Sequence, residues 1–122
     1  MPAPTDPAPH KAIFKIFTPA DWDALERDGT TRGSALDRTD GFLHFSTDAQ
    51  LAETLALHFR SAGELVLARV PLSALRGREV RWEAARGGTL FPHLYGLLER
   101  GDIDRVWRLS PDSAGLYELP EL

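Results

Sequence analysis

The sequence of 122 residues contains no cysteine. Disulfide bonds, metal sites built on thiolates and a cysteine nucleophile are therefore excluded. The chain also lacks an uninterrupted run of the roughly 18 to 20 apolar residues that a membrane-spanning helix needs. No basic segment followed by an apolar one opens the sequence, so no secretory signal is expected. These absences leave the cytoplasm as the default location, and no membrane partner is expected.

An excess of basic residues is missing as well. Asp and Glu outnumber Lys and Arg by 18 to 14, and the formal net charge is -4. Because binding to nucleic-acid phosphates depends on clustered Lys and Arg, we expect no broad nucleic-acid face. A local basic cleft stays open as an alternative, since four arginines follow one another closely: Arg76, Arg78, Arg81 and Arg86. Among these, Arg81 is a candidate ligand-binding residue.

The composition is that of a globular domain. Hydrophobic residues make up 43% of the chain and charged residues 26%, both close to the average for soluble domains. Residues 1–10 are rich in proline and predict a disordered, polyproline-like tail. Residues 11–122 are long enough to bury a real core and predict a single domain.

The most informative stretch is the sequence between Gly41 and Phe59. A short apolar run, Phe42–Phe45, follows a turn signal and predicts a strand in which His44 is the polar residue. Thr47 and Gln50 then have the spacing of a capping box, which predicts that a helix begins at Thr47. Leu51, Leu55 and Phe59 recur at helical spacing and predict one buried stripe.

A strand end and a helix start should therefore meet at one corner. His44, Ser46 and Thr47 fall at that corner, where free N–H groups and the helix dipole favour an anion or a phosphate group. His44 is either a ligand-binding residue or a core histidine satisfied by backbone. Ser46 is a candidate phosphate contact, whereas the helix cap explains Thr47 by itself.

The remaining segments predict further strands and one more helix. Thr18 and Pro19 start a short helix that Gly29 ends. Residues 29–41 read as the longest functional loop, which contains Ser34 as a candidate ligand-binding residue. The segment FPHLYG, residues 91–96, reads as a second loop facing the sheet. Strands are expected at 12–17, 64–70 (central), 78–82 (ending at Glu83) and 103–109, with one helical turn at 71–75.

This order of elements predicts an α+β domain with a curved, split, mixed sheet and two main helices. No glycine-rich dinucleotide fingerprint and no P-loop is present. Glu83 fits either a surface ion pair or a catalytic carboxylate, and His93 and Tyr95 suit a small-molecule cleft or loop packing. A zinc site of His44, His58 and His93 has no short-spaced ligand pair to support it, so no metal is expected.

Several of these motifs, taken together, resemble one protein family. IFKI, Trp22 in the first helix, DGFLHFST with Gln50, LVLARV, RWE and FPHLYG occur in this order between about Ile13 and Val106. They resemble the bacterial family of unknown function DUF952. That family in turn resembles a minimal ADP-ribosyltransferase-like fold, close to the RNA 2'-phosphotransferase branch, in which a split sheet holds NAD in a cleft.

The resemblance implies roles for individual residues. Lys15 matches the position at which the first strand of that superfamily offers His or Arg to the nicotinamide ribose. His44 and Ser46 match a second motif, and Glu83 is the nearest candidate for a third, with His93 or Tyr95 as alternatives. The implied catalytic residues are Glu83 and His44, and the implied ligand-binding residues are Lys15, Ser34, His44, Ser46, Arg81, His93 and Tyr95.

The implied reaction is transfer of ADP-ribose from NAD to a protein, RNA or small-molecule acceptor. Glu83 would stabilise the developing positive charge, His44 and Lys15 would orient ribose and phosphate, and Tyr95 would stack on nicotinamide. The alternative is a non-catalytic module that binds a nucleotide or ADP-ribose, favoured by a lysine where the superfamily has His or Arg. A metal-dependent hydrolase is a third interpretation.

Overall fold

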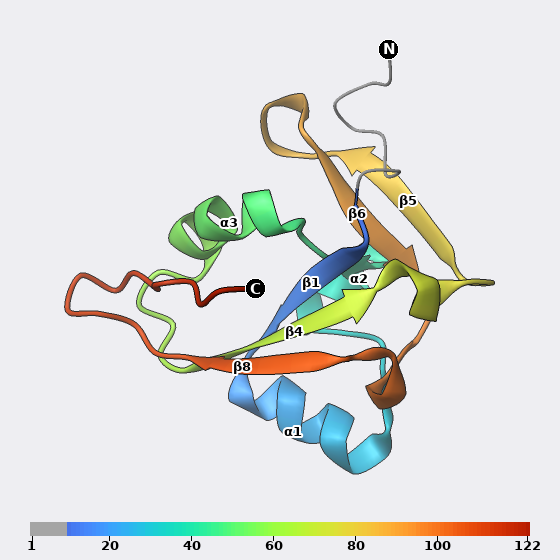
Figure 1. The fold of residues 1–122 in the computed structure, drawn as a ribbon, viewed down its shortest axis with the longest axis horizontal. Helices are drawn as coiled ribbons and strands as arrows, with labels where there is room; N and C mark the ends of the chain where they lie inside the picture. The colour runs from blue at the N-terminus through green and yellow to red at the C-terminus, as the bar shows by residue number, and fades with distance from the viewer. Residues whose placement is uncertain (1–9) are drawn as a thin grey trace.

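The computed structural model describes residues 10–122, and the elements alternate between short helices and strands (Figure 1). Of the tail expected at residues 1–10, residues 1–9 lie outside the described part, and His10 stacks on Trp82 with ring centroids 5.2 Å apart. The elements are β1 (Ala12–Phe17), α1 (Pro19–Asp28), β2 (Thr30–Thr31), α2 (Ala35–Asp40), β3 (Leu43–His44), the 3-10 turn η1 (Asp48–Gln50), α3 (Leu51–His58), β4 (Leu65–Pro71), η2 (Leu72–Leu75), β5 (Glu79–Ala84), η3 (Arg86–Gly88), β6 (Leu90–Tyr95), β7 (Leu98–Glu99), η4 (Arg100–Asp102) and β8 (Arg105–Leu109).

The strands form two three-stranded sheets and one two-stranded sheet. The first sheet has the order β1-β4-β8, so β4 is central as the sequence predicts, and the second has the order β3-β6-β5. Figure 1 shows β1, β4 and β8 side by side, with the β5-β6 hairpin projecting beyond them. Between the two sheets there is one isolated bridge, Phe14 to Ser46, with N–O distances of 2.8 and 2.9 Å. The sheet is therefore split next to β1.

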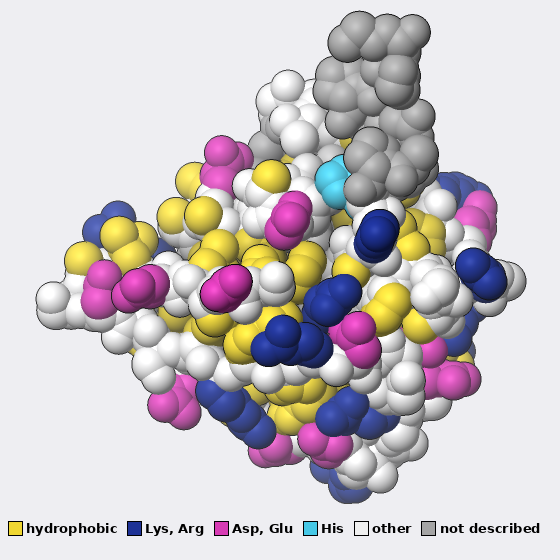
Figure 2. Space-filling model, in the orientation of Figure 1, with side chains coloured by type: hydrophobic (Ala, Val, Ile, Leu, Met, Phe, Trp, Pro, Cys, Tyr) yellow, Lys and Arg dark blue, Asp and Glu magenta, His cyan; other side chains and the backbone are white. Residues whose placement is uncertain are grey.

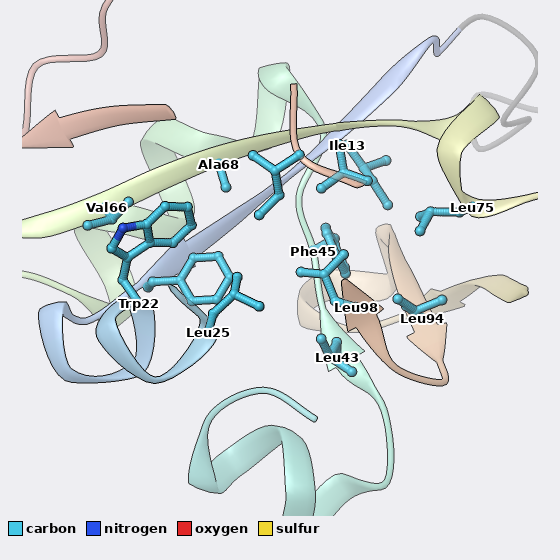
Figure 3. Packing of buried hydrophobic residues seen from close by; sticks show 13 residues of the cluster. Ile13, Trp22, Leu25, Leu43, Phe45, Val66, Ala68, Leu75, Leu94 and Leu98 are labelled. Carbon is cyan, nitrogen blue, oxygen red and sulfur yellow. The ribbon is translucent and has the colours of Figure 1, made fainter. Parts of the chain in front are cut away.

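Alternating side chains of β1 enter two different cores, because successive residues of a strand point to opposite faces. Ile13 and Phe17 belong to the larger core, which also receives Trp22 and Leu25 from α1 (Figure 3). Phe14 packs in the second core, beneath α3. Lys15 lies on the same face as Ile13 and Phe17, so this lysine points toward the larger core.

The helix boundaries follow local sequence rules. Thr18 caps α1, Pro19 is its first residue, and Gly29 ends it with a φ of 80°, as the sequence predicts. At the second predicted helix start, the Gln50 side chain accepts a hydrogen bond from Thr47 N at 3.0 Å. The first turn there is 3-10, and α3 proper begins at Leu51. Leu51 and Leu55 are buried, as expected.

Three expectations about the fold are wrong. Residues 29–41 are not an irregular loop, because they contain β2 and the helix α2, whose capping box joins Ser34 and Asp37. Residues 91–96 are not a loop facing the sheet, since residues 90–95 form β6, the middle strand of the second sheet. The sheet is not mixed, because every pairing between described strands is antiparallel.

The surface mixes charges of both signs. Figure 2 shows Lys and Arg side chains interspersed with Asp and Glu over the face that carries β1, β4 and β8. Two of the four arginines named as a possible basic cleft pair with carboxylates: Arg78 binds Asp102 at 2.5 Å and Arg81 binds Glu79 at 2.6 Å. Among residues 10–122, no helix has both the length and the apolar character needed to cross a membrane.

Candidate functional site

A cavity of about 560 Å³ opens where β1 and β3 separate. Its wall is mostly apolar, and polar side chains from several elements also line it. The apolar part comes from Phe14, Ile16, Leu36, Phe45, Phe59, Ala85 and Phe91, and the polar part from Lys15, Thr18, Asp21, Ser34, Asp37, His44, Ser46, Thr54, His58 and His93. Small-molecule sites usually have this composition and a volume of roughly 300 to 1,000 Å³.

Lys15 is a buried charge in the polar part of the lining. Its side chain is only 5% exposed, and a buried ammonium needs a counter-ion and hydrogen-bond acceptors. Asp37 Oδ2 supplies the charge at 2.8 Å. The backbone carbonyl of His44 accepts a second bond from Nζ at 3.0 Å. The lysine thereby links β1 to β3 beside the backbone bridge between Phe14 and Ser46.

Asp37 holds three parts of the site together. Its Oδ2 also accepts the backbone N–H of Ser34 at 2.9 Å, and its Oδ1 accepts from the N–H and the Nδ1 of His44 at 3.2 and 2.5 Å. Burial by itself raises the pKa of Asp37, but the hydrogen bond from His44 and the charge of Lys15 outweigh it and hold this pKa far below the ordinary value. Asp37 is therefore ionised throughout the physiological pH range.

His44 faces a carboxylate on each side of its ring. Nδ1 contacts Asp37, and Nε2 lies 3.0 Å from Asp40 Oδ2. Each ring nitrogen therefore lies within hydrogen-bond distance of a carboxylate oxygen. The side chain is 34% exposed and also lines the cavity, which makes it accessible to a ligand.

A second histidine lies beside the first, because His44 and His93 are direct partners in the β3-β6 ladder. Their ring centroids are 5.3 Å apart. His93 Nδ1 contacts Glu83 Oε1 at 2.9 Å, and the Tyr95 hydroxyl donates to the same oxygen at 2.5 Å. The bond from Tyr95, together with the one from His93, lowers the pKa of Glu83, and the same contact raises the pKa of Tyr95.

The cavity brings together most of the predicted site residues. Lys15, Ser34, His44, Ser46 and His93 all line it. Glu83, Tyr95 and Arg81 are not part of its lining. Glu83 is connected to the cavity by its contact with His93. The Arg81 guanidinium lies over the Tyr95 ring, 4.4 Å from the ring centroid.

His58, the last residue of α3, lines the same cavity as His44 and His93. Within the part of the chain that the structure describes, however, no group of three His, Asp or Glu side chains is arranged to hold a metal ion.

The comparisons with known proteins agree with the sequence motifs. Residues 16–106 match the model of the family described as "Protein of unknown function (DUF952)". The chain belongs to the DUF952 family. No curated protein matches this DUF952 chain.

Solved structures extend the likeness to the whole fold. The crystal structure of protein CC0527 from Caulobacter crescentus is similar with a TM-score of 0.82 and 41% identity, covering 88% of this chain and 93% of that one. The solution NMR structure of CC0527 gives a TM-score of 0.76 and 42% identity, covering 86% and 90%. These likenesses show the family and the fold of the DUF952 chain and assign it no activity.

The carboxylate that joins the polar residues of this DUF952 site is not expected from the sequence. Asp37 is 2% exposed and contacts both Lys15 and His44. Its spacing from Ser34 is that of a capping box, which was the available signal. The cap alone would not have shown that Asp37 also reaches β1 and β3, because those contacts depend on the tertiary fold. Phe42, whose ring stacks on His93 at 4.1 Å, was also missed as a site residue.

Proposed function

We propose that this DUF952 protein binds NAD in the cavity and transfers its ADP-ribose group. The observation that carries the proposal is the convergence of Lys15, His44, Ser46 and His93 on one mostly apolar cavity. A dinucleotide offers rings for the apolar wall and hydroxyl and phosphate groups for the polar part. The split sheet also supports the resemblance to an ADP-ribosyltransferase-like fold, in which NAD lies in such a split.

Lys15 and His44 would orient ribose and phosphate groups. An ammonium has three donors, and the bonds to Asp37 and to the His44 carbonyl use two of them, which leaves one for a ligand. The His44 ring can exchange the exposed Asp40 for a ligand oxygen at Nε2. Charge-assisted bonds of this kind are stronger than neutral ones and fix the orientation of the bound group.

The negative charges of the cavity lining favour cleavage of the bond between nicotinamide and ribose. Cleavage of the bond between nicotinamide and ribose develops positive charge on the ribose. The lining contains two carboxylates, Asp21 and Asp37, and one lysine. A third carboxylate, Glu83, contacts the lining residue His93. Fixed negative groups around a developing cation stabilise it, because they need no reorganisation during the reaction.

A non-catalytic module that binds a nucleotide or ADP-ribose is the second candidate. One observation favours it: the charged groups are already paired within the protein. Lys15 is neutralised by Asp37 at 2.8 Å, and Glu83 accepts bonds from Tyr95 and His93. Such pairing fixes the side chains of a binding surface, and none of these groups then needs a catalytic role.

Calorimetry with NAD and ADP-ribose, followed by an assay for released nicotinamide, separates the two candidates. Binding with release supports the transferase, and binding without release supports the module. If neither ligand binds, both are wrong. Ser46→Ala should weaken binding because Ser46 lines the cavity, whereas Ser73→Ala, in η2 and outside the lining, should not.

A further inference from the structure

The contact between Glu83 and His93 fixes which nitrogen of His93 carries a proton. Bonds from Tyr95 and His93 lower the pKa of Glu83, so at neutral pH this carboxylate is an anion and can only accept hydrogen bonds. His93 Nδ1, 2.9 Å from Oε1, must then be the protonated nitrogen. In a neutral ring the lone pair therefore lies on Nε2, the arrangement of a histidine base oriented by a carboxylate.

The His93 ring is also held in position. Its side chain is 7% exposed, and the Phe42 ring stacks on it with centroids 4.1 Å apart and planes 25° apart. Strand pairing with His44 fixes its backbone. A ring that is nearly buried yet lines the cavity meets a ligand only from the cavity side. Such fixed placement is what proton transfer requires.

Glu83 acts on the cavity through this ring. Glu83 and Tyr95 are absent from the lining, whereas His93 is part of it. The Arg81 guanidinium on β5 packs over the ring of Tyr95 on β6, 4.4 Å from the ring centroid, and helps to hold Tyr95 in place. Tyr95, Glu83 and His93 thus form a chain of hydrogen bonds that ends at the cavity wall.

We propose that His93, oriented by Glu83, is the base that deprotonates the acceptor, and that the acceptor is a hydroxyl group of water or of a sugar. This inference rests on the proposed ADP-ribosyl transfer. The bond between ribose C1' and the nicotinamide nitrogen breaks, and its electron pair leaves with nicotinamide. The acceptor oxygen forms the new bond to C1', and its proton moves to His93 Nε2 and then to solvent.

An acceptor without a proton tests this assignment. His93→Asn keeps an amide that can donate to Glu83 but has no group that can take up a proton. With water or methanol as acceptor, the variant should release nicotinamide about 100-fold more slowly than the unmodified protein, the usual size of a base contribution. With azide as acceptor, which has no proton to lose, the loss should be much smaller, so the ratio of the water rate to the azide rate should fall. Added ribose, with analysis of the products, distinguishes a sugar hydroxyl from water.

His58→Asn is the matched control, because His58 lines the same cavity from α3. It should not change the ratio of the water rate to the azide rate. Equal losses with azide and with water in His93→Asn would overturn the inference, since they would show a structural role. Full activity of His93→Asn toward water would overturn it too. If the unmodified protein releases no nicotinamide with any acceptor, azide included, the proposed function fails and this inference fails with it.

One measurement needs no turnover. Long-range nitrogen-15 spectra of the four histidines, assigned with single variants, report which nitrogen of each ring is protonated. We expect the proton of neutral His93 on Nδ1. A proton on Nε2 instead would overturn the assignment of His93 as the base, whatever the activity assay shows.

Discussion

Asp37 Oδ1 lies 2.5 Å from His44 Nδ1, and the other oxygen of the same carboxylate lies 2.8 Å from Lys15 Nζ. One buried anion thus joins α2 to β3 and β1, three elements that are separate in sequence. Lys15 depends on Asp37 for its counter-ion, and His44 depends on it for a hydrogen-bond partner. The properties of the site should therefore respond to Asp37 more than to any exposed neighbour.

Asp37→Ala should destabilise the fold strongly. The substitution leaves the Lys15 ammonium, 5% exposed, without its counter-ion. Removal of one partner from a buried ion pair usually lowers the free energy of unfolding by about 3 to 5 kcal/mol. Urea unfolding at neutral pH measures the loss. Asp40→Asn is the control, because this exposed partner of His44 should contribute no more than about 1 kcal/mol. Equal losses in the two variants would contradict the central role of Asp37.

Acid should weaken the protein partly through Asp37. Its pKa is far lower in the folded chain than the ordinary value of about 3.9. A group with a depressed folded pKa contributes stability above its unfolded pKa, and the contribution is lost as the pH falls toward the folded pKa. From about pH 5 downward, the unmodified protein should lose unfolding free energy faster than Asp37→Asn. Parallel curves from urea titrations at several pH values would refute this.

Gly33→Ala should disturb the site through Asp37. Gly33 has a φ of +91°, and a Cβ on it would overlap the Asp37 carboxylate. Gly41→Ala is the matched control, with a φ of +85° and open space around its Cβ position. The backbone strain of the left-handed region, roughly 1 to 2 kcal/mol, is common to both variants. Gly33→Ala should be the less stable by urea unfolding, and it alone should weaken binding of NAD by calorimetry.

Glu83→Gln should lower the pKa of Tyr95. The hydrogen bond to Glu83 is the main cause that raises this pKa, because it favours the protonated phenol. Without the negative charge, the transition should move to lower pH. Tyrosinate absorbance measures it in a Tyr117→Phe background, which leaves Tyr95 as the single tyrosine, since the chain has two. An unchanged transition would show that Tyr95 and Glu83 are not in contact in solution.

His44→Ala should affect binding more than folding. The ring is 34% exposed, and after its removal Asp37 keeps Lys15 and two backbone donors. We expect the melting temperature to fall by only a few degrees while the affinity for NAD is lost. A collapse of stability as large as that of Asp37→Ala would mean that His44 is a core residue and not a ligand contact. Thermal unfolding and calorimetry on both variants give the comparison.

Local chemistry made several elements predictable. The first strand has the predicted limits, 12–17, and the helix Pro19–Asp28 follows from its cap, its proline and the glycine that ends it. The capping pair Thr47 and Gln50 likewise marked the next helix start. These signals involve residues within one turn of each other, so they act in the same way in any fold.

The errors arose where tertiary contacts outweighed local preference. The segment FPHLYG is expected from the sequence to be a loop, yet residues 90–95 form the middle strand β6, because β3 and β5 pair with it on both sides. The helix α2 is only six residues long. A helix that short is marginal by itself, and contacts of Asp37 with Lys15 and His44 hold it in place.

Local signals along the chain specify several strands and helices, the family, and the residue types available for chemistry: Lys15, His44, Ser46, Glu83 and His93. Which of these residues share a cavity, and which of them pair with one another, follows from the way the chain packs. Burial explains the difference. A lysine placed on the inward face of β1 must find an anion, and the nearest one comes from a helix more than twenty residues away along the chain, in Asp37. No spacing rule connects such residues, because the desolvation of a charge is a property of the folded state alone.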